Sequence, residues 1–350
     1  MNDDSTMMQV AVMTDIERTE FVERPIPEVL PGEVLVKVEH VGVCGSDLHY
    51  YGSGRIGNFI VEPPFVLGHE AGGTVVAIGE GVASLSVGDR VALEPGKTCG
   101  HCEFCKSGRY NLCPDVEFFA TPPIGGVFQE YVAHPAELCF KLPDCVSTME
   151  GALIEPLAVG FHAANQAGAE LGKTAVVMGA GCIGLMCLMA LKAKGVSFVM
   201  VVDVVRSRLD KALELGADAV TDGGAPEVYD ELMRLCDGRG YDIVIDAAGS
   251  EKTVSLGIRV AKKGGVLVFV GYSASGMMTL PIGMVLDKEL TLKSVFRYRN
   301  IYQMAIEAVA SGKVNLKGIV SHRYQFKDIA RGLNESLHNK SEVIKAVIDL

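Results

Sequence analysis

The sequence predicts an α/β protein in two parts, a mostly β part and a doubly wound parallel sheet. Short strand-like runs separated by Gly and Pro turns continue to about residue 142. From about residue 158 onward, apolar strands alternate with helical patterns, which is typical of βαβ units around a parallel sheet. A chain of 350 residues is long enough for two such domains.

The first part reads as a barrel-like body of short strands. Apolar residues alternate with charged ones from Glu33 to Glu39, as in a strand with one buried face. Turn residues then recur at short intervals, at 31–32, 72–73, 87–89, 122–123 and 125–126. Short strands with this spacing favour an all-β body.

The second part begins with a strand, a glycine-rich turn and a helix. We predict strands over Thr174–Met178, Phe198–Asp203, Tyr241–Asp246 and Val266–Val270, and helices over Cys182–Lys194 and Arg206–Leu215. Residues 175–191 are nearly all apolar and approach the length of a membrane span. The glycines that interrupt this run and the lysines that end it favour a buried strand–turn–helix instead.

The overall charge excludes some partners. The formal net charge is -11 and the basic residues form no run, so we expect neither nucleic acid nor an anionic membrane as a partner. The first residues do not have the charged and apolar order of a secretory signal, and we therefore expect a cytoplasmic protein.

A dinucleotide-binding motif follows the first apolar strand of the second part. Gly179, Gly181 and Gly184 fit G-x-G-x-x-G, and Asp203 lies 19 residues beyond Gly184 at the end of the next strand. Gly179 permits the tight turn, Gly181 lets the backbone approach a pyrophosphate, and Gly184 permits close packing of helix and strand. Asp203 would accept hydrogen bonds from ribose hydroxyls and repel a 2′-phosphate, which favours NAD over NADP. An ordinary βα turn without a ligand is the alternative.

Four of the ten cysteines form a dense cluster. Cys99, Cys102, Cys105 and Cys113 have C-x2-C-x2-C-x7-C spacing, which is typical of a closed structural zinc site. Reduced or disulfide-bonded cysteines are the alternative, although the spacing is crowded for disulfides.

A second, scattered set of residues has the mixed chemistry of an open catalytic zinc site. It consists of Cys44, His69, Glu70 and Glu155. Glu155 stands among apolar residues, where a carboxylate needs a partner. On spacing alone, Cys44 is equally compatible with a buried apolar residue, and His69 and Glu70 with exposed polar positions.

These motifs together resemble the zinc signature of the medium-chain dehydrogenase/reductases. The resemblance rests on Gly68-His69-Glu70-x2-Gly73-x5-Gly79-x2-Val82 and on Cys44-Gly45-Ser46-Asp47 with His49, and it covers essentially the whole chain. Three further stretches are similar to the sorbitol and xylitol dehydrogenase group: His49-Tyr50-Tyr51, Glu155-Pro156-Leu157-Ala158-Val159 and Val295-Phe296-Arg297-Tyr298. Ordinary alcohol dehydrogenases carry a cysteine ligand where this chain has Glu155.

The resemblance implies a fold and a set of roles. It implies a GroES-like catalytic domain over 1–157 and 297–350, with a structural zinc lobe at about 95–115, and a Rossmann domain over 158–296. Cys44, His69, Glu70 and Glu155 would serve the catalytic zinc, and the two carboxylates would exchange as ligands. Ser46, His49 and Glu155 would carry the proton. The polyol would contact Tyr50, Glu155, Arg297 and Tyr298. NAD would contact the three fingerprint glycines together with Ile183, Asp203, Arg208, Gly271, Tyr272, Ser273, Val295, Phe296 and Arg297.

The implied reaction is the oxidation of a polyol, such as sorbitol or xylitol, to a ketose. Zinc would act as a Lewis acid on the hydroxyl, and hydride would pass to NAD. The same fold acting on L-threonine, butanediol or a simple secondary alcohol is the nearest alternative, and a non-catalytic nucleotide-binding protein is a more distant one. Family resemblance also implies a homotetramer or a homodimer.

Overall fold

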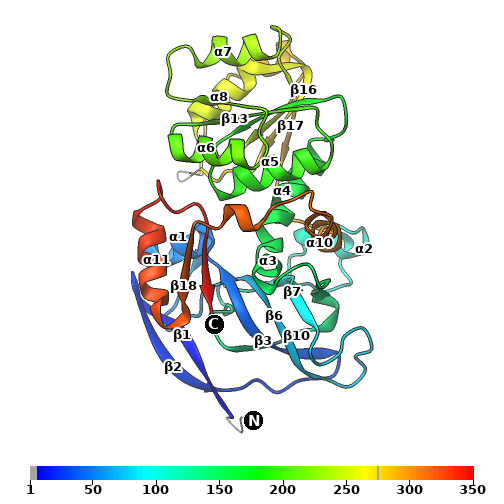
Figure 1. Ribbon diagram of the computed structural model, residues 1–350, viewed down its shortest axis with the longest axis vertical. Helices are drawn as coiled ribbons and strands as arrows, with labels where there is room; N and C mark the ends of the chain where they lie inside the picture. The colour runs from blue at the N-terminus through cyan, green and yellow to red at the C-terminus, as the bar shows by residue number, and fades with distance from the viewer. Residues whose placement is uncertain (1–5, 274–275) are drawn as a thin grey trace. The chain divides into compact units, whose positions relative to one another are not determined.

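A computed structural model describes residues 6–273 and 276–350, which divide into two compact units (Figure 1). The first unit runs to Glu155 and takes in Tyr302–Ile306 and Val320–Leu350, and the second comprises Pro156–Ile301 and Glu307–Ile319. Residues 307–319 therefore pack with the second unit, whereas the family resemblance implies that they belong to the first domain. The two units are described separately.

The first unit is built on a sheet of seven strands in the order β11-β7-β6-β3-β19-β18, with β10 also paired to β3. These strands are β3 (Glu33–Gly42), β6 (Glu70–Ile78), β7 (Arg90–Leu93), β10 (Tyr131–Pro135), β11 (Cys139–Lys141), β18 (His322–Gln325) and β19 (Ala346–Asp349). Four short strands and a hairpin complete the unit: β1 (Met7–Asp15) with β2 (Arg18–Pro25), β4 (Arg55–Ile56) with β5 (Phe59–Ile60), and β8 (Gly96–Lys97) with β9 (Glu117–Phe118).

Strand β3 lies in the middle of this sheet, as its alternating sequence predicts. Val34, Val36 and Val38 are at most 1% exposed, whereas Lys37 between them is exposed. Apolar side chains from β1, β3, β6 and β7 form one core with residues of the C-terminal segment. The last strand of the chain, β19, pairs antiparallel with β3.

The helices of this unit were not predicted. They are α1 (Gly45–Ser53), α2 (Glu103–Lys106), α3 (Thr148–Ala152) and α11 (Ile329–His338). Helix α1 begins with a capping box in which the Cys44 N–H donates to Asp47 Oδ2 at 3.1 Å, and it ends at Gly54, whose φ is 71°. Helices as short as α1, α2 and α3 depend on their caps and on tertiary packing, so their sequences carry little periodicity.

The second unit contains a six-stranded parallel sheet in the order β14-β13-β12-β15-β16-β17. The strands are β12 (Thr174–Met178), β13 (Phe198–Asp203), β14 (Ala219–Asp222), β15 (Tyr241–Asp246), β16 (Ala261–Phe269) and β17 (Thr291–Ser294). Numbered along the chain this is 3-2-1-4-5-6, the strand order of a Rossmann fold. This confirms the predicted α/β class, in which a doubly wound parallel sheet accompanies a mostly β unit.

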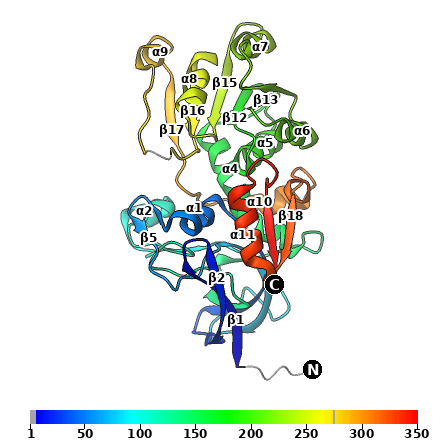
Figure 2. The ribbon, with the colours of Figure 1, turned by 90° about the vertical axis from the view of Figure 1, so that its left-hand side faces the viewer.

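Helices cover both faces of this sheet. The helices that lie wholly within the second unit are α5 (Cys182–Ala193), α6 (Arg206–Glu214), α7 (Val228–Leu235), α8 (Glu251–Val260) and α9 (Ile282–Asp287). Helices α4 (Ile154–Gln166) and α10 (Tyr302–Ala310) cross the division between units. Side chains of α7, α8 and α9 share a core with Val176, Met178 and other residues of one sheet face. Figure 2 shows α9 beside β17 and α6 at the other end of the sheet, near β13.

The apolar run at 175–191 forms β12, the glycine turn and α5, as predicted. Within the described parts of the chain, no helix combines the length and the apolar character needed to cross a bilayer.

Candidate metal and dinucleotide sites

Three of the four scattered metal-ready residues come together in the first unit. Cys44 immediately precedes α1, His69 immediately precedes β6, and Glu70 is the first residue of β6. One ligand atom from each lies within 4.8 Å of the others, and His69 and Glu70 are 6% and 0% exposed. A sulfur, a nitrogen and an oxygen donor at this separation are a set that could supply three ligands to a four-coordinate zinc ion with an open position.

Asp47 is a buried residue of this site to which the sequence analysis gave no role. Its Oδ1 lies 3.4 Å from His69 Nδ1 and accepts the Gly68 N–H at 3.0 Å. Burial by itself would lower the pKa of His69, but the charges of Asp47 and Cys44 outweigh it and raise that pKa well above its usual value. Asp47 thus fixes the ring and leaves Nε2 for a metal ion, an arrangement common around metal-bound histidines. The only sequence signal was its position three residues after Cys44.

Glu70 supplies a test of whether a metal ion fits here. Its Oε2 is paired with the ammonium of Lys345, but among the described residues its buried Oε1 has no hydrogen-bond partner. A buried carboxylate oxygen without a partner is costly unless a cation completes its surroundings. The donor set and this oxygen therefore fit a zinc ion held by Cys44, His69 and Glu70.

Glu155 does not belong to the three-residue group in the structure. It lies in the first turn of α4 and is 5% exposed. The predicted polyol contact Tyr50 is buried in α1, and Ser46, in the first turn of that helix, is half-buried. The Phe118 ring lies 5.8 Å from the His69 ring, so this aromatic side chain does border the metal-binding residues.

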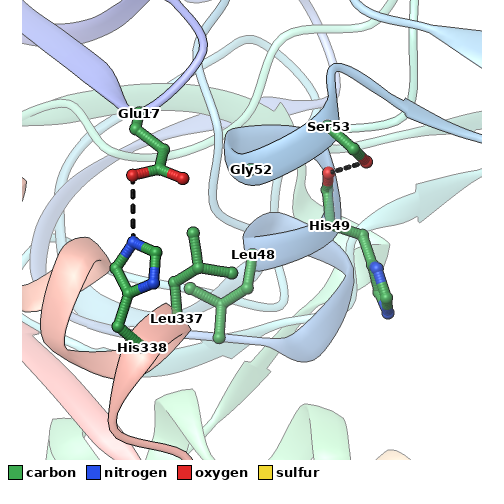
Figure 3. A pocket seen from close by; sticks show the side chains of 7 residues that line it. All are labelled: Glu17, Leu48, His49, Gly52, Ser53, Leu337 and His338. Atoms are coloured by element: carbon green, nitrogen blue, oxygen red, sulfur yellow. Dashed lines mark hydrogen bonds and ion pairs between the residues drawn. The ribbon is translucent and has the colours of Figure 1, made fainter.

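His49 lines a pocket of about 260 Å³ between α1 and α11 (Figure 3). On one side of the pocket His338 Nε2 contacts Glu17 Oε2 at 2.9 Å, and the His49 ring points away from this pair. Partial burial and, to a smaller extent, the charge of Lys340 lower the pKa of His49. A lowered pKa favours the neutral imidazole, the form that can accept a proton.

The four clustered cysteines also come together, and all are free thiols rather than disulfides. Their ligand atoms lie within 4.8 Å of one another, with Cys99 Sγ and Cys105 Sγ 3.9 Å apart. Backbone N–H groups point at the sulfurs, for example Cys102 N at 3.3 Å from Cys99 Sγ. Four convergent sulfurs with N–H donors fit a closed tetrahedral zinc site.

A buried carboxyl group links this cysteine lobe to the β sheet. Glu94, 4% exposed, follows β7, and its Oε1 accepts the Tyr110 hydroxyl at 2.8 Å. Burial raises the pKa of Glu94 to about 7, and the Tyr110 hydrogen bond only partly opposes this. The pKa of Glu94 is higher in the folded protein than the value of 4.5 in the unfolded chain, so protonation of Glu94 favours the folded state. This contribution to stability is fully present below pH 4.5. That contribution is lost as pH rises through about 7.

We therefore expect Glu94→Gln to be more stable than the wild type at pH 8, by about 3 kcal/mol, since each pKa unit corresponds to about 1.4 kcal/mol. The amide keeps an oxygen for Tyr110 but carries no charge, so the difference should shrink toward pH 4.5. Denaturant unfolding at several pH values measures it, with the exposed Glu137→Gln as control. A gain that does not change with pH would contradict the explanation.

The dinucleotide fingerprint of the second unit adopts the predicted strand–turn–helix. Gly179 has a φ of 100°, and a Cβ on Gly184 would lie 1.8 Å from the Gly179 carbonyl oxygen. A Cβ on Gly181 would meet nothing within 4 Å. Gly179 and Gly184 are thus required by the fold of the loop, whereas the space beside Gly181 is open to a ligand.

Asp203 ends β13 beside this loop. Its Oδ2 accepts the Ala180 N–H at 2.6 Å and its Oδ1 accepts the Val205 N–H at 2.9 Å. A carboxylate accepts about four hydrogen bonds, so both oxygens can also accept ribose hydroxyls. Ile183 is the second residue of α5, and Arg208 is half-buried in α6.

The remaining predicted cofactor contacts follow the carboxyl ends of β16 and β17. The Gly271 N–H donates to the Asp246 carbonyl at 2.8 Å, and the Val295 N–H donates to Phe269 at 3.0 Å. Tyr272 is 66% exposed, and the Ser273 hydroxyl donates to Met277.

The run after β17 combines exposed and buried side chains of the second unit. The Arg297 guanidinium lies 4.9 Å from the centre of the Phe296 ring, and Phe296 is 53% exposed. Tyr298, the next residue, is only 3% exposed. Arg297 itself has a positive φ, 54°, which is uncommon for this residue type.

Asp246 was not predicted from the sequence. This fully buried residue accepts the Gly249 N–H and the Thr253 hydroxyl, and so holds the loop after β15.

A Rossmann sheet with this fingerprint, accompanied by a β unit with two zinc-binding clusters, defines a zinc- and nicotinamide-dependent alcohol dehydrogenase. Residues 30–144 match the alcohol dehydrogenase GroES-like domain, and residues 182–311 match the zinc-binding dehydrogenase domain. The chain belongs to the medium-chain dehydrogenase/reductase family, in its sorbitol dehydrogenase group.

Similar proteins cover nearly the whole chain. It is 40% identical to a sorbitol dehydrogenase of Bacillus subtilis, over 97% of each sequence. It is 43% identical to D-xylulose reductase A of Aspergillus niger, over 93% of this chain and 92% of that protein. Among solved structures, an Escherichia coli oxidoreductase of unknown specificity superposes with a TM-score of 0.94 at 41% identity, covering 98% of this chain and 99% of that one.

Proposed function

We propose that the protein is an NAD-dependent zinc polyol dehydrogenase that converts sorbitol, xylitol or a similar polyol to the ketose. The observation that carries this proposal is the buried Cys44, His69 and Glu70 group, in which a carboxylate oxygen lacks a partner among the described residues. Relatives named sorbitol dehydrogenase and D-xylulose reductase support the polyol class.

The site residues of the first unit each have a role in this reaction. Zinc, when bound, supplies a Lewis acid that lowers the pKa of a substrate hydroxyl. Cys44, His69 and Glu70 hold it, and Asp47 fixes the His69 ring. We assign Glu155 to the same centre as an alternating ligand and base. Ser46 and His49 would pass the proton outward, because both lie on α1 and His49 lines a pocket open to solvent.

The second unit would bind the cofactor as NAD rather than NADP. The nicotinamide ring supplies the hydride acceptor. Asp203 supports this choice because its charge disfavours a 2′-phosphate. Ile183, Arg208, Gly271, Tyr272 and Ser273 are the further contacts that we assign to NAD, together with Val295, Phe296 and Arg297.

Arg297, together with Tyr50 and Tyr298, is assigned to the polyol. A guanidinium presents several fixed donors to adjacent hydroxyls. We expect Arg297→Ala to raise KM for the polyol roughly tenfold, the equivalent of about 1.4 kcal/mol. Lys293→Ala is the control, because Lys293 is exposed and its ammonium donates to the Gln166 carbonyl instead. Steady-state kinetics with both variants decides, and equal KM values would remove Arg297 from the polyol site.

The function itself is tested by NADH formation with sorbitol, xylitol, L-threonine, 2,3-butanediol and a simple secondary alcohol, each with and without a zinc chelator. Chelator-sensitive turnover of a polyol supports the proposal. Turnover of only the other alcohols would assign the same chemistry to a different substrate. Zinc-replete protein that turns over none of them would contradict the proposed catalysis.

We also propose a cytoplasmic homodimer or homotetramer. Strand β17 is an edge of the second unit's sheet with one partner strand, and exposed apolar side chains lie close by in sequence, among them Met277, Ile282 and Leu286. An exposed edge with apolar neighbours favours pairing with a second copy. Light scattering on the purified protein measures the mass.

A further inference from the structure

Lys345 is a buried cation beside the metal-binding residues that no part of the reaction above uses. Its side chain is 2% exposed, and its ammonium pairs with Glu70 Oε2 and donates to the Val43 carbonyl at 3.0 Å. Its sequence context, Val343-Ile344-Lys345-Ala346-Val347, is otherwise apolar. A lysine at such a position needs a specific partner.

We infer that Lys345 is a positioning residue for the catalytic metal, and that Gly42 makes this possible. Lys345 holds one carboxylate oxygen of Glu70, so that the other oxygen, Oε1, stays directed at the metal ion. The inference rests on the proposed metal site, and it adds two residues that determine how tightly that site binds zinc.

The strand register shows how a residue near the C-terminus reaches Glu70. Gly42 of β3 is paired with Glu70 of β6 on one side and with Val347 of β19 on the other. Lys345 lies two residues before Val347, and its side chain must pass β3 at Gly42 to reach Glu70.

Gly42 is required by this crossing. A Cβ at position 42 would lie 1.9 Å from Glu70 Oε2 and 3.1 Å from Lys345 Cε. The φ of Gly42 is not in the positive range, so alanine could adopt its backbone conformation. Glycine is therefore needed at position 42 because it leaves space for the ion pair, and not because of its backbone conformation.

The ion pair between Lys345 and Glu70 does not satisfy all the polar atoms of the Glu70 carboxylate. A buried pair is stabilising only if its remaining polar atoms also have partners. Glu70 Oε2 is paired with the Lys345 ammonium, and neither carboxylate oxygen of Glu70 has a further hydrogen-bond partner among the described residues. A carboxylate that is fixed by one cation and keeps free lone pairs close to Cys44 and His69 suits a preorganised metal ligand.

The test is zinc affinity, measured as zinc per chain after equilibration with graded chelator. We expect Lys345→Met to release one zinc at roughly 10- to 100-fold lower chelator concentration than the wild type, the usual cost of losing a group that orients a metal ligand. Lys141→Met is the matched control, because Lys141 pairs with Asp89 at 2.7 Å but is 61% exposed. Gly42→Ala should have the same effect as Lys345→Met, and Gly125→Ala, whose Cβ would make only an ordinary contact at 3.9 Å, should have none.

A coupling measurement separates positioning from general stability. In a Glu70→Gln background, Lys345→Met should change zinc affinity less than threefold, because its effect passes through the Glu70 carboxylate. The visible spectrum of the cobalt-substituted protein should change in Lys345→Met and remain the same in Lys141→Met.

Unchanged zinc release and an unchanged cobalt spectrum in Lys345→Met would overturn the inference. If that variant does not fold, Lys345→Gln decides, since glutamine keeps a donor for Glu70 Oε2 but removes the charge, and unchanged zinc release and an unchanged cobalt spectrum in that variant would equally overturn the inference. Wild-type protein that binds zinc only at the four-cysteine cluster would refute the proposed catalytic site itself, which is a different result.

Discussion

Gly181→Ala should weaken NADH binding roughly 10- to 100-fold and leave the stability of the protein unchanged. The substituted Cβ would meet no atom of the protein within 4 Å, and the backbone conformation at position 181, with φ -70°, accepts alanine. The extra methyl would instead occupy the space where the pyrophosphate approaches the start of α5. Overpacking of this kind costs about 1–3 kcal/mol.

Fluorescence titration with NADH and thermal unfolding of the free protein measure the two effects. Gly283→Ala in α9, whose Cβ also would meet no atom within 4 Å, should leave NADH binding unchanged and raise stability slightly, because alanine has the higher helix propensity. Gly184→Ala should lower both binding and stability, because its Cβ would collide with the Gly179 carbonyl oxygen. Normal NADH binding by Gly181→Ala would place the cofactor elsewhere.

Cys44→Ser and Cys113→Ser should each lose one zinc ion, but the first should lose activity and the second should lose stability. The first variant should lose roughly 10³-fold in kcat/KM, because a Lewis acid supplies several kcal/mol of the catalysis, and should keep its melting temperature. The second should melt roughly 10 °C lower, because a closed zinc site contributes folding energy to a lobe with few other contacts.

Zinc analysis, kinetics and thermal unfolding of the two variants distinguish these outcomes. Cys145→Ser is the matched control, because Cys145 is exposed and lies outside both clusters. Loss of activity without loss of stability in Cys113→Ser would reverse the assignment of the two sites.

Features that are local in sequence were predictable from the sequence. The glycine fingerprint, the strands Thr174–Met178 and Phe198–Asp203, and the four-cysteine cluster each occupy a short segment whose spacing is set by backbone geometry. Strands buried on both faces also have continuous apolar sequences, so β12, β13 and β15 were placed correctly to the residue. The helices α1 and α3 were missed because so few residues show little periodicity. Helix α11 was missed although Ile329, Leu333 and Leu337 have helical spacing.

By itself the sequence determined the α/β class, the fingerprint loop and the identity of the metal-ready residues. Only the tertiary structure decided which of those residues meet, because the pairing of β3 with β6 places Gly42, two residues before Cys44, opposite Glu70. It also decided that Asp47 orients His69 and that Lys345, at the far end of the chain, pairs with Glu70. Such contacts depend on how segments that are separated in the chain pair and pack, and residue spacing carries no signal for them.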